Sequence, residues 1–294
     1  MHLVTPFQVS RILLEDLSEM SVKGEIHSAF ENCVNGLFNT DQVFNIIPER
    51  TWVNPRSIQV TQNDWVEHQL SQIDRGDSFH IDEQILYIPD LNIYLDLKKA
   101  MIWDPNGNHF PRGLSIHQVL ENLRIVKIVF DKCEDRFMSS THFNKSLKER
   151  VLFFKRSLVD GNHSRIDGAI TSLIGFGPGL TPTGDDFLTG FMAALHFLER
   201  IGYCSPYGNK IFDFIKLSCI GKTSLISQQM LLDGASGQFA LPITKLMKDI
   251  LTRDDEDLLK DSINNLLGLG AYSGFDILGG ILCGIELSLF NPLR

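Results

Sequence analysis

Apolar and polar positions along the first part of the chain follow the period of a β-strand. In the stretch NIYLDL (92–97), apolar residues alternate with polar or aromatic ones, as in a half-buried strand. Residues 43–60 are rich in β-branched and aromatic side chains and are interrupted by two prolines. The runs at 84–88 and 124–130 are further strand candidates. This part of the chain is therefore predicted to be rich in β-strands.

The period changes to that of a helix near residue 140. Apolar residues then recur every three or four positions, so they share one helix face; these are Phe143, Leu147, Val151, Phe154 and Leu158. This helix should end at 160–162, where Asp, Gly and Asn follow one another. Further helices are predicted over 165–174, 184–200, 209–219, 223–233, 239–251 and 255–268, with a last one from about 274. Asp254 or Asp255 should cap the helix that begins at 255.

Strands followed by helices indicate an α+β fold. We expect a β-rich N-terminal domain over 1–140, and a helical domain over 141–294 that carries a loop with the sequence GPGLTPTGDD.

Composition narrows the class of protein. A net charge of −9 argues against a generally basic nucleic-acid-binding surface. The five scattered cysteines form no CxxC pair, which suggests reduced thiols. No signal peptide is recognisable, and the most apolar stretch (277–290) is shorter than the roughly 20 residues that a membrane helix needs. A cytoplasmic protein that binds neither membrane nor nucleic acid is expected.

One glycine-rich motif is partly repeated further along the chain. The segment GFGPGLTPTGDDFLTG spans 175–190, and its second half, TGDDFLTG (183–190), resembles SGFDILGG (273–280). The shared pattern is [ST]-G-x-D-x-L-x-G. Both copies follow a glycine-rich run and lead into an apolar helix, so each is predicted to start a helix.

The spacing within each copy predicts a capping box. Thr183 and Ser273 would be N-cap residues, and Asp186 and Asp276 would reach back to the N–H of the cap. In this interpretation both aspartates are structural. The glycine after each leucine should let a neighbouring helix come close.

The glycines next to the two caps suggest a binding function. Gly184 and Gly274 carry no side chain, so a phosphate or carboxylate could approach the free N–H groups of the first helical turn. Gly177, Gly179 and Thr181 belong to the same candidate binding loop. Two ordinary helix starts without a ligand remain the alternative, above all for the second copy.

Asp185 has no counterpart in the second copy. We therefore expect this acid to face the site, where it would accept a proton or N–H from substrate or bind Mg²⁺; no other cofactor is indicated.

A third segment, GKTS (221–224), is not a P-loop, because Lys216 stands where that motif needs glycine. Thr223, Ser224 and Ser227 remain, either as helix caps or as hydrogen-bond partners of a small polar ligand. Motifs of zinc enzymes, serine hydrolases and nicotinamide enzymes are absent from the sequence.

Together the three segments resemble the signature of the AllH-type subunit of oxamate carbamoyltransferase. The resemblance is carried by GFGPGLTPTGDDFLTG, by TSLIS with LLDGASG, and by GLGAYSGFDILGG, and covers about 140–294. The third segment departs from the family pattern, because Ala271 and Tyr272 stand where the family often has His and Thr.

The resemblance implies phosphorolysis of oxalurate to oxamate and carbamoyl phosphate in anaerobic allantoin breakdown. It also implies two partner subunits, one related to acyl-CoA synthetases. Asp185, Thr223 and Ser224 are the candidate catalytic residues, and Lys222 is a candidate source of positive charge. The candidate substrate or phosphate ligands are Gly177, Gly179, Thr181, Thr183, Gly184, Ser227, Ser273 and Gly274. Two alternatives stay open: a non-catalytic assembly subunit, and a Mg²⁺-dependent phosphotransferase that acts alone.

Overall fold

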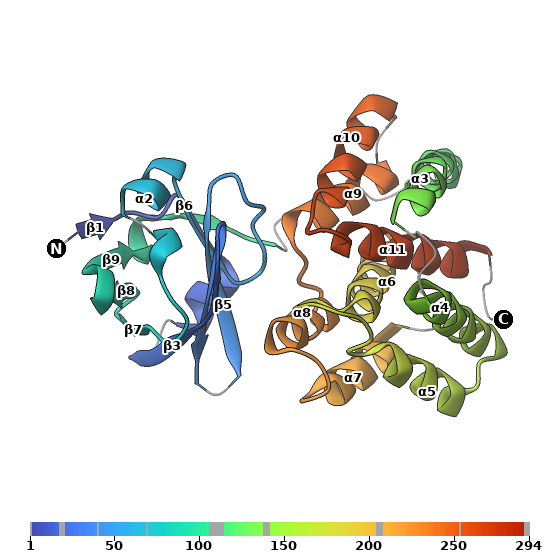
Figure 1. Cartoon of the computed structure of the whole chain (residues 1–294). Coiled ribbons are helices and arrows are strands. Elements are labelled where there is room, and N and C mark those ends of the chain that lie inside the picture. The colour runs from blue at the N-terminus through green and yellow to red at the C-terminus, as the bar shows by residue number, and fades with distance from the viewer. Residues whose placement is uncertain are drawn as a thin grey trace. The chain divides into compact units, whose positions relative to one another are not determined.

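The computed structural model of the chain consists of two compact units, Met1–Asn108 and His109–Arg294, each with its own hydrophobic core (Figure 1). The structure describes residues 2–17, 21–39, 41–68, 70–105, 115–137, 142–203, 208–252 and 254–290.

The first unit is built on one mixed sheet. Within the described residues its strands are β1 (His2–Val4), β2 (Gln8–Ser10), β3 (Val22–Phe30), β4 (Cys33–Phe38), β5 (Gln42–Pro48), β6 (Ser57–Val60), β7 (Ser78–Asp82), β8 (Ile85–Ile88), β9 (Ile93–Asp96) and β10 (Met101–Trp103). Their order is β1-β9-β8-β7-β3-β4-β5-β6-β2-β10. The pairs β1–β9, β2–β10 and β5–β6 are parallel, and the others are antiparallel. The strand predictions at 43–60, 84–88 and 92–97 are confirmed.

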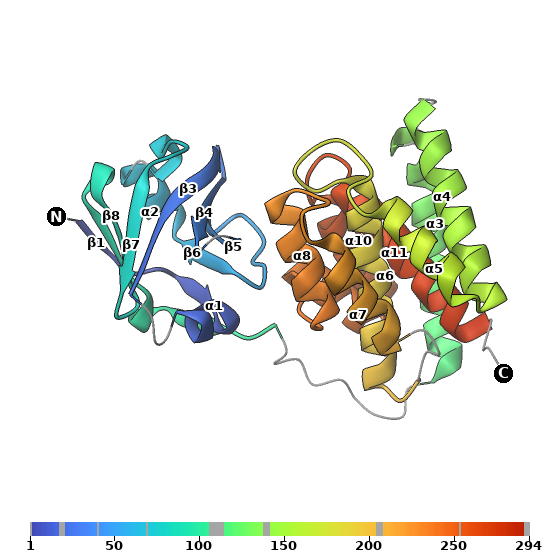
Figure 2. The same cartoon turned by 90° about the horizontal axis from the view of Figure 1, so that it is seen from below.

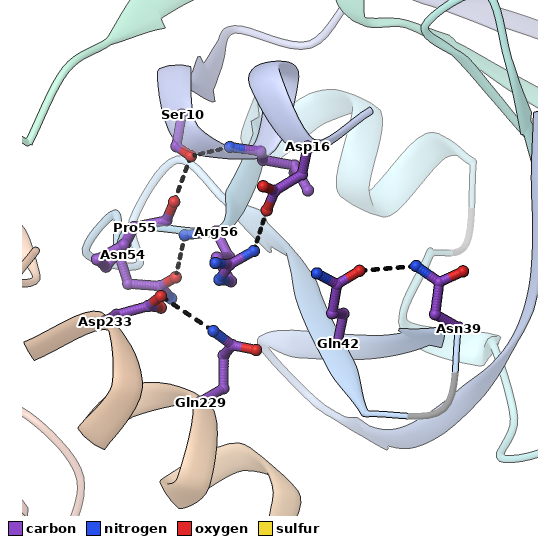
Figure 3. Close-up of polar contacts among 10 residues, drawn as sticks. Ser10, Asp16, Asn39, Gln42, Asn54, Pro55, Arg56, Gln229 and Asp233 are labelled. Carbon is purple, nitrogen blue, oxygen red and sulfur yellow. Dashed lines mark hydrogen bonds and ion pairs between the residues drawn. The ribbon is translucent and has the colours of Figure 1, made fainter. Parts of the chain in front are cut away.

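Two short helices, α1 (Arg11–Asp16) and α2 (Gln62–Glu67), and three 3-10 turns, η1 (Leu70–Gln72), η2 (Pro89–Leu91) and η3 (Leu97–Lys99), connect the strands. Figure 3 shows how α1 is fixed. The Ser10 hydroxyl accepts the N–H of Leu13 at 3.2 Å and donates to the carbonyl of Pro55, while Asp16 pairs with Arg56. The loop before β6 is thereby tied to the end of β2.

The second unit is helical. Its helices are α3 (Ile116–Phe137), α4 (His142–Asp160), α5 (His163–Leu173), α6 (Thr183–Arg200), α7 (Gly208–Cys219), α8 (Leu225–Ala235), α9 (Leu241–Thr252), α10 (Glu256–Leu267) and α11 (Ser273–Phe290). The helices expected after residue 140 are all present. The strand prediction at 124–130 is wrong, because this segment lies inside α3.

Helix ends follow the local sequence. Helix α4 stops at Asp160, and Gly161 takes a positive φ of 65°. The Asn162 side chain then caps α5, and the Asp255 side chain caps α10 by accepting two backbone N–H bonds. The cap predicted for α10 is confirmed at Asp255.

Helices α6 and α11 lie side by side in the centre of the helical unit (Figure 2). Both are buried on nearly all sides, which explains why their sequences are apolar without a clear polar face. No helix among the described residues combines the length and the hydropathy that crossing a membrane requires. The α+β fold with a β-rich first part and an all-helical second part is confirmed. A boundary at 140 between independently folding domains stays a prediction.

Candidate functional site

The two copies of the [ST]-G-x-D-x-L-x-G pattern meet at the start of α6 and α11. The glycine-rich loops that precede these helices lie at the same end of the helical unit (Figure 2). The hydroxyl oxygens of Thr181, in the first loop, and Ser273, at the start of α11, are 3.0 Å apart. Segments some 90 residues apart in the chain are therefore neighbours in the fold.

The predicted capping box at Thr183 is not formed. Pro182 is the N-cap of α6, its carbonyl accepts the N–H groups of Asp185 and Asp186, and no side chain caps this helix. At α11 the carbonyl of Tyr272 accepts the N–H groups of Phe275 and Asp276 in the same way. Each helix thus starts at the residue that was expected to be its cap, one residue earlier than predicted.

Each acid instead binds a hydroxyl of the opposite copy, and Asp186 also binds one from the loop before its own helix. Ser273 and Thr181 donate hydrogen bonds to the carboxyl group of Asp186. Thr183 donates to the carboxyl group of Asp276. The repeated Ser/Thr and Asp positions therefore link the two helices to each other rather than close each helix on itself.

The repeated glycines make this approach possible. A Cβ atom on Gly190 would lie 2.0 Å from the carbonyl oxygen of Ile277, and one on Gly280 would lie 2.0 Å from that of Phe187. Real side chains cannot stand so close, so only glycine fits at these crossings. The expectation that these glycines admit a neighbouring helix is confirmed.

The helix-start glycines are also packing positions. A Cβ atom on Gly184 would lie 2.0 Å from the carbonyl oxygen of Leu173, and the N–H of Gly184 donates to the Phe176 carbonyl at 2.8 Å. The N–H of Gly274 donates to the Leu269 carbonyl at 3.0 Å. These two N–H groups were expected to be free for an anion, but the preceding loops use both of them.

Asp185 joins three segments of the helical unit. It is fully buried, and its Oδ1 accepts the N–H of Gly175 at 2.8 Å. Its Oδ2 accepts the hydroxyl of Ser227 at 2.7 Å and the hydroxyl of Thr223. Burial raises the pKa of Asp185, while these three hydrogen bonds oppose the shift. No group of three or more His, Cys, Asp or Glu side chains that could hold a metal ion occurs among the described residues. Both carboxyl oxygens of Asp185 accept hydrogen bonds from the chain itself.

The segment before α8 also binds the glycine-rich loop directly, through Ser224. Ser224 caps α8 by accepting the N–H of Ser227 at 3.1 Å, and its hydroxyl donates to the carbonyl of Leu180. The ordinary capping role that was left open is thus present for Ser224. Thr223 and Ser227 both donate to Asp185, although Thr223 lies before the N-cap of α8 and not on the helix face predicted for it.

The hydrogen bonding and the pKa of Asp186 differ from those of Asp185. It is 1% exposed, and its Oδ1 has no hydrogen-bond partner among the described residues. Burial raises the pKa of Asp186 well above its usual value, and the nearby charges of Asp276 and Asp185 raise it further. Burial also raises the pKa of Asp276 to about 7. The surroundings of Asp186 therefore favour its protonated form.

The glycine-rich loop before α6 is exposed at 178–180, on the surface side of Asp186. Gly175, Gly177 and Gly179 all have positive φ values, of 69°, 130° and 95°, which favour glycine. Gly179 is exposed, while Thr181 and Ser273 are half-buried between Asp186 and the surface. The arrangement can pass a proton between a buried acid and a surface ligand through a hydroxyl.

Arg150 is a cation at this loop that sequence reasoning missed. Its guanidinium carbon lies 4.2 Å from the ring centroid of Phe176, and Nη1 donates to the carbonyl of Ser172. Its Nε is buried without a partner in the described part of the chain. Arg150 lies three residues after Leu147 and four before Phe154, so the helical period already placed it on the core-facing side of α4.

Comparison with known families gives two matches. The family described as oxamate carbamoyltransferase subunit AllH matches residues 173–285, and the AllH family N-terminal domain matches residues 6–102. No curated protein and no solved structure matches the chain. The first match contains all three segments that meet at Asp185 and Asp186, and the two matches together cover most of both units. The chain therefore belongs to the AllH family, whose members are subunits of oxamate carbamoyltransferase.

Proposed function

We propose that this chain takes part in the phosphorolysis of oxalurate to oxamate and carbamoyl phosphate. We further propose that the junction of its three glycine- and hydroxyl-rich segments faces the reacting molecules. The observation that carries this proposal is the convergence of these segments on two adjacent buried acids, Asp185 and Asp186. Two other subunits complete the enzyme, one of them related to acyl-CoA synthetases, and it works in cytoplasmic allantoin breakdown.

The reaction needs a proton at the leaving group. A phosphate oxygen attacks the carbamoyl carbon, the bond from that carbon to the oxamate nitrogen breaks, and this nitrogen takes up a proton. Asp186 suits this step, since burial raises its pKa and so favours the protonated form, and since it lies under the hydroxyls of Thr181 and Ser273. The Thr181 hydroxyl, which belongs to the glycine-rich loop, is the proposed relay of the proton to a ligand above it.

Phosphate also needs positive charge. Arg150 lies against the ring of Phe176 in the loop and keeps its positive charge at this end of the helical unit. The side chain of Lys222, in the segment before α8, is exposed and supplies a second candidate. The partner subunits can add further cations.

The roles of the two acids can be told apart. The sequence favoured Asp185 as the chemical residue, and this stays a proposal. The three donors to Asp185 instead support a positioning role, while the raised pKa of Asp186 and its contacts with the Thr181 and Ser273 hydroxyls support proton transfer. We favour Asp186 as the acid.

The test is oxalurate phosphorolysis by the assembled enzyme with Asp185→Asn, Asp186→Asn or Asp213→Asn in this chain. Asp213 lies exposed on α7 and is the matched control. Asp186→Asn should lower kcat by about 100-fold while leaving the melting temperature near that of the unaltered chain. Asp185→Asn should mainly lower the melting temperature, and Asp213→Asn should change neither. A folded but inactive Asp185→Asn enzyme, with Asp186→Asn fully active, would reverse the assignment.

A non-catalytic assembly subunit is the second candidate. It is favoured by the internal use of the N–H groups of Gly184 and Gly274, which leaves these two donors unavailable to an anion. In that case every one of these variants should keep full kcat once the complex has assembled.

A further inference from the structure

A cavity of about 360 Å³ lies between α3, α4, α6 and α11, and no residue of the glycine-rich loop 175–182 is among its described lining residues. Its size is within the range of small-molecule sites. The walls are mostly apolar and include Val151 and Leu282. The rings of Phe130 and Phe275 stack with centroids 4.5 Å apart and planes inclined by only 6°, which gives the cavity a flat aromatic wall. Gly279 lies against the Phe130 ring and leaves the space beside it open.

Charged side chains gather at the opening of this cavity. Lys127, Lys148 and Lys155 line it together with two exposed or half-buried acids, Asp131 and Glu286. One carboxylate serves two of the lysines, because Glu286 lies 3.6 Å from the Lys127 ammonium and 3.5 Å from that of Lys155. Among the described residues that line the cavity, three lysines and two acids therefore lie at the opening.

One further acid lies in the wall. Asp276 is 8% exposed and receives the hydroxyl of Thr183. Burial raises its pKa to about 7, so its negative charge is partly suppressed at neutral pH. The cavity thus combines apolar walls with a weakly cationic opening.

We propose that this cavity binds an amphipathic organic anion, with its apolar body against Phe130 and Phe275 and its anionic group at Lys127 and Lys155. The molecules of the proposed reaction are small and polar and have no apolar body, so they do not match these walls. A neighbouring cavity of about 280 Å³ shares Lys127, Leu282 and Glu286 with the first, which gives an elongated ligand room along α3 and α11. The proposal does not depend on the proposed reaction.

The test uses two fluorescent probes with nearly the same apolar body. Anilinonaphthalene sulfonate carries one negative charge, and N-phenylnaphthylamine carries none. Both should bind the full chain, the anionic probe more tightly. Lys155→Met should weaken binding of the anionic probe at least threefold, on the order of one exposed charge pair. Glu286→Gln should tighten it by a similar factor, because it removes the carboxylate that pairs with both lysines. Neither change should alter binding of the neutral probe.

Lys210→Met, at an exposed position on α7, is the control and should leave both affinities unchanged. Val151→Trp should fill the cavity and weaken both probes about tenfold or more, with circular dichroism to verify the fold. Lys155 and Glu286 are partly exposed, so their variants should fold. They therefore keep the test valid if Val151→Trp does not fold. The proposal is overturned if the full chain binds neither probe, if Glu286→Gln fails to tighten the anionic probe, or if folded Val151→Trp binds both probes normally.

Discussion

At the scale of single residues, the site is a set of buried carboxyl groups whose pKa values are raised above their ordinary values. Burial raises the pKa values of Asp185, Asp186 and Asp276, and hydroxyl donors oppose the shift without cancelling it. A carboxyl group whose pKa is higher in the folded chain binds its proton more tightly there. Such a group favours the folded state at low pH and loses this contribution as pH rises through its folded pKa.

Asp276 gives this effect a measurable window. Its pKa is about 7 in the folded chain and about 4 when unfolded, so the free energy of unfolding should fall between these pH values and level off above about 7. The contribution is up to about 4 kcal/mol. Asp276→Asn resembles the protonated acid and should flatten this part of the profile, as measured by urea unfolding at several pH values. An unchanged slope in the variant would contradict the assignment.

Part of this site could be predicted from residues alone. The repeat of Thr183 and Asp186 at Ser273 and Asp276 indicated two related helix starts, and the structure brings them together. The hydrogen-bond partners could not be predicted, because a spacing of three residues suits both a capping box and the exchange of partners between two helices. Only the close crossing of α6 and α11 decides between them.

At the scale of elements, the glycines of α6 and α11 set the distance between the two central helices. Gly280→Ala would place a Cβ about 2 Å from the Phe187 carbonyl oxygen, so the helices must separate. Overpacking of this kind should cost about 1–3 kcal/mol or more in the free energy of unfolding.

Gly168→Ala is the matched control for this prediction. Gly168 lies exposed within α5, with no atom within 4 Å of an added Cβ. Here alanine should stabilise the chain by up to about 1 kcal/mol through helix propensity. Equal effects of the two substitutions in thermal or urea unfolding would show that helix propensity, not the crossing, governs Gly280.

Most helices after residue 140 could be predicted from their period, but α3 could not be recognised from a short window. The run at 124–130 is apolar and β-branched, which suits a strand. The wider pattern is helical, since Val119, Leu123, Val126 and Phe130 follow at spacings of four, three and four. The buried positions of Val119, Leu123 and Val126 confirm this helix face.

At the scale of the whole molecule, each unit has its own core, so each should fold alone. A fragment of residues 109–294 should unfold cooperatively, as followed by circular dichroism. A fragment of residues 141–294 lacks α3, which packs on α9, α10 and α11, and should be much less stable. If both fragments were equally stable, the boundary would lie nearer 140, as the sequence suggested.

Membership of the AllH family implies that other subunits of the carbamoyltransferase exist, so the account must be tested in the complete enzyme. The central claim is that the junction of the three segments faces the reacting molecules.

The most direct measurement is kcat for oxalurate phosphorolysis by the assembled enzyme containing Thr181→Val. This change keeps the shape of the side chain but removes a half-buried hydroxyl that lies above Asp186 and 3.0 Å from the Ser273 hydroxyl. Thr252→Val is the control. Among the described contacts, the Thr252 hydroxyl bonds only to the carbonyl of Lys248 in its own helix. The account predicts that Thr181→Val lowers kcat at least about tenfold, with a melting temperature and a Thr252→Val activity close to those of the unaltered enzyme. Full activity of a correctly assembled Thr181→Val enzyme would contradict it.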